Sequence, residues 1–305
     1  LRVASPTTLR RALLETAKPT LAERARNELY ERMPAFSARI VVNAWQGLVI
    51  GLLIAFLAVA MSIETSASLL GLHLFFSIFF LFCIGLRFAA LSSPPLRPPE
   101  GLEQTPADQL PRYAILVALH REAEVVPQLL AALDRIVWPR SKLEVKIVCE
   151  ADDRPTLQAL RSRWLPPHVE IVEVPAGAPR TKPKALCYAL PLVRSDFVVL
   201  YDAEDRPHPL QLLEAWHAFD AAGPDLACVQ APLDISNPSE SRISELFAFE
   251  YRALFRGLLP FLSGRHILLP LGGTSNHFRT EALRDVGGWD PYNVTEDADL
   301  GIRLL

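Results

Sequence analysis

The sequence predicts an α/β protein with a Rossmann-like, mostly parallel sheet, preceded by a two-helix transmembrane hairpin. The hairpin is indicated by two long apolar segments, residues 41–61 and 69–86. The sheet is indicated by the region from residue 112 onward, where short apolar runs of strand length alternate with segments of helical periodicity. That alternation is typical of βαβ units, whose strands lie parallel in one sheet.

The composition of the chain excludes some classes of protein. Half of the 305 residues are hydrophobic and the formal net charge is -3, which is too little positive charge for a nucleic-acid-binding protein. The four cysteines have no Cys-x-x-Cys spacing, which predicts reduced, structural thiols and no zinc site. The chain begins at Leu1 and ends at Leu305 within a helical pattern, so we expect it to be a fragment of a longer protein.

Each apolar segment is long enough to cross a bilayer as a helix, and the short loop between them predicts a hairpin. A buried helix pair in a soluble protein is the alternative. Lys and Arg are frequent before the first segment and Arg87 and Arg97 follow the second, whereas the connecting loop has Glu64 and no Lys or Arg. The positive-inside rule then places both ends in the cytoplasm. The predicted parts are an N-terminal cytosolic or interfacial segment (1–40), the hairpin (41–91), a stiff proline-rich linker (92–111) and a domain that is incomplete at its C-terminus (112–305).

The domain from residue 112 is predicted to alternate strands and helices along the chain. The predicted strands cover residues 113–119, 144–149, 169–174 and 197–201, and the predicted helices cover residues 122–137, 156–164, 184–193 and 209–222. Ligands of such sheets bind beyond the carboxyl ends of the strands, and acidic residues stand at several of these ends. Farther on, residues 246–259 have an apolar face beside two arginines, which fits either an interfacial helix or a buried core helix.

Three acidic clusters, within residues 150–153, 202–205 and 296–299, suggest one acidic site that uses a metal. Crowded carboxylates repel one another unless a cation lies between them, and Mg²⁺ is usually held by one or two carboxylates with phosphate oxygens. Asp202 with Glu204 or Asp205 offers such a pair, and solvated loop acids are the alternative.

The third cluster follows Thr295, which can cap a helix whose positive end favours Glu296 and Asp297. A plain helix start with an acidic first turn is the alternative.

Six ordered motifs resemble those of the family-2 glycosyltransferases, in particular the cellulose-synthase-like membrane branch. They are LVALHRE at 116–122, DDRPT at 152–156, KPKAL at 182–186, YDAED at 201–205, GGTSN at 272–276, and GGWD at 287–290 followed by TED at 295–297. Two of them depart from the family's pattern. Arg154 and Pro155 replace a glycine and a serine, and the metal-binding Asp-x-Asp is here Asp202-Ala203-Glu204. The family's Gln-x-x-Arg-Trp motif would fall beyond Leu305.

The resemblance implies a GT-A-type fold and a role for each matching residue. The implied catalytic residues are Asp297 as general base, Glu296 and Asp202. The implied donor-binding residues are Leu119, Glu122, Asp152, Asp153, Lys184 and Asp202, with Lys182 as the weaker alternative to Lys184. The implied acceptor-side residues are Gly273, Thr274, Ser275, Trp289 and Thr295, and a core position is the other interpretation of Trp289. Mg²⁺ or Mn²⁺ is implied at Asp202 with either Glu204 or Asp205.

The function that the resemblance implies is that of an inverting, metal-dependent hexosyltransferase. It would move a sugar from a nucleotide sugar, usually a UDP-sugar in this family, to a growing polysaccharide at the cytoplasmic membrane face. Three alternatives stay open: transfer of one sugar to a lipid or lipid-linked acceptor, a degenerate nucleotide-binding domain without catalysis, and a metal-dependent nucleotide hydrolase.

The expected partners are the nucleotide-sugar donor, a glycan or lipid-linked acceptor and the lipid bilayer, with no nucleic acid and with protein partners undefined. The Arg-rich, Lys-poor composition of a membrane-anchored enzyme suggests the bacterial inner membrane.

Overall fold

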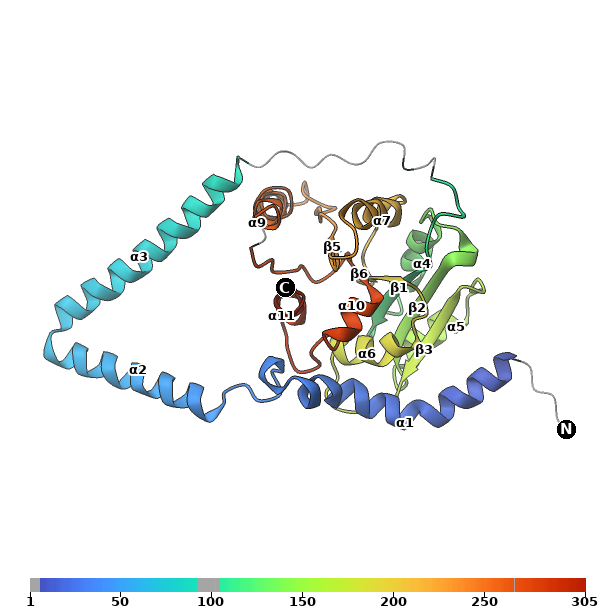
Figure 1. Cartoon of the computed structure of the whole chain (residues 1–305), viewed down its shortest axis with the longest axis horizontal. Helices are drawn as coiled ribbons and strands as arrows, with labels where there is room; N and C mark the ends of the chain where they lie inside the picture. Colours follow the sequence, from blue (N-terminus) through green and yellow to red (C-terminus); the bar gives the residue numbers. More distant parts are fainter. Residues whose placement is uncertain (1–5, 93–101, 103–104, 266) are drawn as a thin grey trace. The chain divides into compact units, whose positions relative to one another are not determined.

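The structure is a computed structural model that describes residues 6–92, 102, 105–265 and 267–305 (Figure 1). Apart from the gaps between these ranges, the chain divides into two compact units. The first consists of residues 1–37, 97–232 and 268–305, and we call it the catalytic unit. The second consists of residues 38–96 and 233–267, and we call it the apolar unit.

The catalytic unit is built on one six-stranded sheet with the strand order β3-β2-β1-β4-β6-β5. The strands are β1 (Tyr113–Leu119), β2 (Leu143–Glu150), β3 (Val169–Val174), β4 (Phe197–Tyr201), β5 (Cys228–Gln230) and β6 (Asn276–Arg279). The first four are parallel, and β6 pairs antiparallel with β4 and with β5. The predicted mostly parallel sheet is therefore confirmed. Sequence reasoning missed β5 and β6, which are too short to show a period.

Helices cover both faces of this sheet, so its inner strands are apolar on both sides. Tyr113, Ile115 and Val117 of β1 join one core cluster, and Ala114 and Leu116 join the other. The first cluster includes side chains of α4 (Val126–Asp134), α5 (Arg154–Arg161) and α7 (Gln211–Ala222). The second includes side chains of α1 (Pro6–Arg32), α6 (Lys182–Ala189), α10 (Thr280–Asp285) and α11 (Glu296–Arg303). The two core clusters of the unit therefore lie on opposite faces of β1.

The helix after β1 begins later than predicted. Residues 122–125 form a loop, and α4 starts at Val126. The cause is local: Arg121 has a positive φ of 60°, and the Glu122 backbone N–H donates to the Thr156 hydroxyl at 3.0 Å. The loop leaves His120 and Glu122 at the end of β1, where a ligand can reach them.

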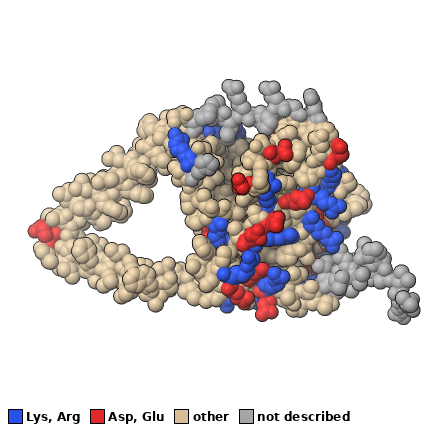
Figure 2. All heavy atoms as spheres, viewed as in Figure 1, with Lys and Arg blue, Asp and Glu red and all other residues tan. Residues whose placement is uncertain are grey.

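The apolar unit contains the two long apolar helices, α2 (Ala44–Ile63) and α3 (Thr65–Ala90). Their mean hydropathies are 2.3 and 2.4, and each is long enough to cross a membrane. Asn43 and Gln46 form a capping box that starts α2. Figure 2 shows the two helices as an almost uncharged surface, in contrast to the mixed charge on the catalytic unit. The helices lie close to the predicted spans, 41–61 and 69–86, with a shorter turn between them.

The same unit holds α8 (Arg242–Ala253), a π-helical segment (Leu254–Leu258) and α9 (Leu259–Ser263). Within α8 only Ala248 is buried, while Ile243, Leu246, Phe247 and Phe249 are exposed. Arg252 and Arg256 instead pair with Asp234. Of the two interpretations of residues 246–259, the exposed amphipathic helix fits α8, whereas Phe255 and Leu259 farther along are buried.

Gly301 in α11 gives a test of the packing around the candidate site. A Cβ at this position would collide with the Leu269 carbonyl oxygen and lie 3.2 Å from Leu271. We expect Gly301→Ala to destabilise the protein by about 1–3 kcal/mol, because backbone must move to relieve the overlap. Thermal unfolding of the detergent-solubilised protein measures this. Gly257→Ala is the matched control, since nothing lies within 4 Å of its new Cβ. Equal melting temperatures for the two variants would contradict the packing described here.

Candidate active site

A cavity of about 350 Å³ lies at the carboxyl ends of the parallel strands, where ligands of open α/β sheets bind. It is lined by Ala118, Leu119, His120, Glu122, Glu150, Arg180, Thr181, Lys182, Ala185, Asp202, Ala203 and Glu204. These residues come from the ends of β1, β2 and β4 and from the start of α6. The edge at which the sequence placed its acidic clusters is therefore a real cavity.

The three acidic residues of the turn after β4, Asp202, Glu204 and Asp205, have different roles. Asp205 accepts a hydrogen bond from the Asp202 backbone N–H at 2.8 Å and another from the Thr274 hydroxyl. Burial raises the pKa of the Asp205 carboxyl, and the charges of Asp202 and Glu204 raise it further. Asp205 is thus a structural acceptor that shapes the turn. Glu204 is exposed and lines the cavity together with Asp202.

The two lysines at the start of α6 point in different directions. Lys182 contacts the Asp202 carboxylate and donates to the Gly273 carbonyl at 3.1 Å. Lys184 is buried, pairs with Glu150 at 2.5 Å and donates to the Gly177 carbonyl at 3.3 Å. The second oxygen of Glu150 is buried and has no hydrogen-bond partner among the described residues. Lys182, the weaker alternative from the sequence, is therefore the lysine beside the acidic turn.

The two aspartates after β2 are also distinct. Asp153 accepts from the Arg121 backbone N–H at 2.6 Å and caps α5 through the Thr156 backbone N–H. Although burial raises the pKa of Asp153, these hydrogen bonds lower it below its usual value. Asp152 is exposed and pairs with Arg180, a lining residue of the cavity, at 2.6 Å. Asp153 therefore holds the loop, and Asp152 stands near the rim.

Glu122 of the same cavity lies close to the acidic turn. Its carboxylate accepts from the His120 backbone N–H at 3.1 Å. Burial raises the pKa of Glu122, and the charges of Glu204 and Asp202 raise it further. Three carboxylates therefore face one small volume, which is where a cation or a proton would be stabilised.

The GGTSN loop, residues 272–276, is fastened to the sheet on both sides. Gln230 accepts from the Gly272 N–H at 2.7 Å and donates to the Thr274 carbonyl at 3.0 Å. Ser275 has a positive φ of 56°, and its N–H donates to the Leu200 carbonyl at 2.8 Å. The loop is thereby fixed next to the turn after β4, with Gly273 between Lys182 and α11.

Asp297 in the first turn of α11 closes the other side of this loop. A Cβ on Gly273 would lie 3.3 Å from its Oδ2 atom, so the missing side chain of Gly273 makes room for the Asp297 carboxylate. Burial raises the pKa of neighbouring Glu296, and the charges of Asp297 and Asp202 raise it further against the lowering effect of Lys182. The Glu296 carboxyl at the start of α11 thus interacts electrostatically with both members of the Lys182–Asp202 pair.

Two residues predicted on the acceptor side take other positions. Thr295 makes no capping hydrogen bond to α11; its hydroxyl donates to the Asn293 side chain at 3.1 Å. Thr295 therefore stands at the predicted N-cap position of α11, but its side chain does not make the capping hydrogen bond. Trp289 is 1% exposed and packs edge-on against Phe278 in the core. A buried indole has no face free for a sugar, so the core interpretation of Trp289 fits the structure.

Sequence reasoning named Glu150 only as a member of the acidic cluster at 150–153, and it missed Arg180 as a lining residue of the cavity. The position of each residue was a further signal. Glu150 is the last residue of a strand, and Arg180 stands two residues before the helix that begins with Lys182. Either position points to the ligand-binding edge of a parallel sheet.

Comparison with known proteins identifies what this arrangement resembles. Residues 111–305 match the family model described as "Glycosyltransferase like family 2". "Probable glucomannan 4-beta-mannosyltransferase 1" of Arabidopsis thaliana is 28% identical over 212 residues, which are 67% of this chain and 38% of that protein. "Glucomannan 4-beta-mannosyltransferase 7" of the same plant is 24% identical over 200 residues, 63% of this chain and 36% of that protein. The chain therefore spans well under half the length of these curated relatives.

Among solved structures, the mannosyltransferase PcManGT from Pyrobaculum calidifontis, in complex with GDP-Man and Mn²⁺, has a TM-score of 0.53 at 21% identity. The match covers 73% of this chain and 59% of that one. It confirms the predicted GT-A-type fold.

The raised pKa of Glu296 predicts a pH-dependent effect on stability. The folded state binds the Glu296 proton more tightly than the unfolded chain does, so stability is lost as the pH rises through the folded pKa. In EDTA, Glu296→Gln should therefore melt at a higher temperature than the wild type near neutral pH, with no gain below the usual pKa of glutamate. Melting curves over a pH series test this, with Glu281→Gln, an exposed residue of α10, as control. A variant that melts lower at every pH would refute the electrostatic account.

Proposed function

Because this chain belongs to the glycosyltransferase-like family 2, we propose that it transfers a hexose from a nucleotide sugar to a glycan acceptor. The observation that carries the proposal is the meeting of Asp202, Lys182 and Asp297 around Gly273. A donor cavity, a cation and a candidate base are then adjacent, as sugar transfer requires. A nucleotide hydrolase would have similar acids but no reason for the GGTSN and TED segments, so the transferase is favoured over that alternative.

The nucleotide sugar is proposed to occupy the cavity at the ends of β1, β2 and β4. Leu119 and Glu122 line this cavity and are proposed to contact the nucleoside, together with Asp152, which pairs with the lining residue Arg180. Lys182 is the proposed cation at the diphosphate. Buried Lys184 would act through Glu150 instead, whose unpaired oxygen can accept a hydrogen bond from a donor group of the ligand. UDP-hexoses are the first candidates, and the mannosyltransferase relatives add mannosyl donors to them.

A divalent cation, Mg²⁺ or Mn²⁺, is proposed at Asp202 and Glu204. Both carboxylates line the cavity and both raise the pKa of Glu122, whereas Asp205 is occupied by Thr274 and the turn backbone. No cluster of three or more potential metal ligands exists within the described part of the chain. Two carboxylates are enough for an ion that takes its other ligands from phosphate and water. Such an ion supplies neutralisation of the charge that develops on the departing diphosphate.

Asp297 is the proposed general base. It would accept the proton of the acceptor hydroxyl as that oxygen attacks the anomeric carbon, opposite to the departing diphosphate, so that the configuration inverts. The sugar would pass through an oxocarbenium-like transition state. Glu296 stands beside the base, and burial and then the negative charge of Asp297 raise its pKa. Thr274 and Ser275 are proposed to hold the backbone that faces the acceptor, rather than to contact it through their buried side chains.

Membrane attachment is proposed from the two apolar helices and from α8. A hairpin before the catalytic unit favours a growing polysaccharide as acceptor over transfer of a single sugar to a lipid-linked acceptor. The exposed apolar face of α8 would lie in the bilayer surface, and the basic residues at both ends of the hairpin favour the cytoplasmic side. The plant origin of the curated relatives gives no support to the bacterial inner membrane.

The first test of this function replaces the proposed base. Asp297→Asn removes the proton acceptor but keeps the shape of the side chain, so transfer should fall about 10²–10⁴-fold while donor binding is unchanged. The measurement is sugar transfer by the membrane-embedded protein from labelled UDP-hexoses and GDP-mannose, with product sizing. Asp220→Asn, exposed on α7, is the matched control. Nucleotide binding with no transfer from any donor in the wild type would instead favour a degenerate domain.

The second test separates the two acids of the turn. Glu204→Gln should raise the Mn²⁺ concentration that gives half-maximal transfer by about tenfold or more, because a metal ligand is lost. Its melting temperature should stay close to that of the wild type. Asp205→Ala should instead destabilise the protein by about 1–3 kcal/mol, because the Asp202 N–H loses an acceptor. If Asp205→Ala instead raised the Mn²⁺ requirement and Glu204→Gln lowered the melting temperature, Asp205 would be the metal ligand.

A further inference from the structure

The helix α1, which precedes the apolar hairpin in the chain, packs against the rest of the catalytic unit. Its Ala25 and Leu29 are 4% and 3% exposed. Leu29 lies so close to Gly287 that a Cβ there would be 2.8 Å from the Leu29 Cδ1 atom, and Gly287 also has a positive φ of 81°. The chain therefore needs glycine at 287 both for its backbone conformation and for the approach of α1.

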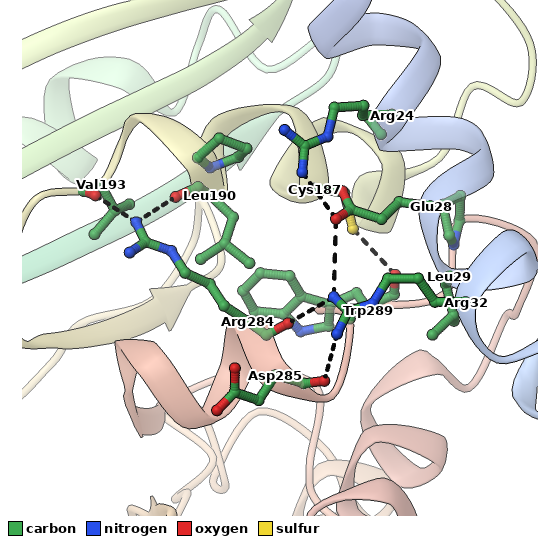
Figure 3. A pocket seen from close by; sticks show the side chains of 14 residues that line it. Arg24, Glu28, Leu29, Arg32, Cys187, Leu190, Val193, Arg284, Asp285 and Trp289 are labelled. Atoms are coloured by element: carbon green, nitrogen blue, oxygen red, sulfur yellow. Dashed lines mark hydrogen bonds and ion pairs between the residues drawn. The ribbon is translucent and has the colours of Figure 1, made fainter.

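Arg32 at the end of α1 reaches across to α10. Its guanidinium donates to the carbonyl oxygens of Arg284 at 3.4 Å and Asp285 at 3.2 Å (Figure 3). These carbonyls belong to the last turn of α10, and that of Arg284 also accepts from the Gly287 backbone N–H at 3.0 Å. A positive side chain at this end also complements the helix dipole. Arg32 thereby fixes the point at which the chain leaves α10 toward the GGWD segment.

Ser37, which follows α1, makes a second contact with the segment after α10. Its hydroxyl donates to the Asp290 carboxylate at 3.4 Å. Asp290 is fully buried and also accepts the Tyr292 backbone N–H at 3.0 Å. The last residues of the α1 region thus hold the lead-in to the Thr-Glu-Asp motif at 295–297.

The same lead-in, residues 286–291, is bonded to the two helices that carry the proposed site. On the α6 side, Thr181 donates to the Pro291 carbonyl at 2.8 Å and Cys187 to the Trp289 carbonyl at 3.0 Å. On the α11 side, Arg303 donates to the carbonyls of Val286 and Gly288 at 2.5 Å and 2.7 Å. Lys182 starts α6 and Asp297 lies in the first turn of α11. This segment therefore connects Lys182, the proposed cation at the diphosphate, with Asp297, the proposed base.

A cavity of about 520 Å³ lies beside these contacts, between α1 and the residues of α6 and α10 (Figure 3). Beside this cavity, the buried Ala25 and Leu29 pack α1 against the unit, and the polar contacts of Arg32 and Ser37 add direction to that packing. Arg24, which also lines the cavity, pairs with Glu28 of its own helix at 3.0 Å. Of these two arginines of α1, Arg32 is the one whose hydrogen bonds reach the end of α10, directly before the lead-in.

We propose that α1 is a positioning element of the active site, and that Arg32 and Ser37 align the lead-in so that Asp297 stands correctly against Gly273 and Lys182. The catalytic part of the proposal rests on the function proposed above. The mechanical part does not, because it concerns only what holds residues 286–297 in place. Arg32 and Ser37 are positioning residues that act through the lead-in.

Arg32→Gln tests the proposal, with Arg24→Gln as the matched control on the same helix. Both variants lose one positive charge, but only the first loses bonds to the α10 carbonyls. In the full-length protein in lipid nanodiscs, we expect hydrogen exchange of the amides in 286–299 to rise about tenfold in Arg32→Gln and to stay unchanged in Arg24→Gln. The kcat of transfer should fall about tenfold while the Kd of the donor nucleotide stays the same. Ser37→Ala should behave similarly, with Ser37→Thr restoring the rate.

The outcomes are distinguishable. Unchanged exchange and an unchanged kcat in Arg32→Gln would overturn the proposal. So would a general loss of melting temperature with equally weakened donor binding, because that describes a merely structural residue. If the wild type transfers no sugar, the proposed function fails, and the exchange measurement alone then decides whether α1 holds the lead-in.

Discussion

The hydrogen-bonded turn after β4 is the constraint on which the candidate site depends. Asp205 and Thr274 both bond the Asp202 backbone N–H, so the acidic turn and the loop at 272–276 form one bonded unit. A buried carboxylate is costly unless its oxygens accept hydrogen bonds, so this turn has few alternative arrangements. Lys182 extends the unit from Asp202 to Gly273, and Gly273 leaves room for Asp297. Donor and acceptor sides are therefore held by a single short network.

The inner parallel strands of the sheet were predictable because they are buried on both faces, whereas the edge strand β3 shows apolar residues interspersed with acidic ones. A continuous apolar run such as that of β1 or β4 needs no partner information to be read as a strand. β5 and β6 have three and four residues, and their pairing is antiparallel, so neither length nor periodicity identifies them. β6 nevertheless follows the loop that carries Gly273. Its position depends on contacts with β4 across a long stretch of sequence, which no local pattern encodes.

The residue types of the site and its edge of the sheet were predictable, whereas the direction of individual side chains was not. Lys182 and Lys184 stand two positions apart on a helix, which turns them about 200° from each other, so one reaches the cavity and one the core. Asp205 differs from Glu204 in direction because it accepts a hydrogen bond from Thr274, a residue far along the chain. The Thr295 hydroxyl donates to Asn293 and makes no capping hydrogen bond, while the Thr295 carbonyl accepts from the Asp299 N–H of the helix that follows.

The seating of α1 also constrains the path of the chain through a bilayer. Residues before and after the apolar hairpin belong to the same compact unit, so the polypeptide must return to the side from which it left. Any membrane that residues 38–92 enter is therefore crossed an even number of times. This parity argument uses no charge and no hydropathy, only the fact that a folded unit cannot lie on two sides of a membrane at once. An odd number of crossings would require α1 to separate from α6, against which it packs.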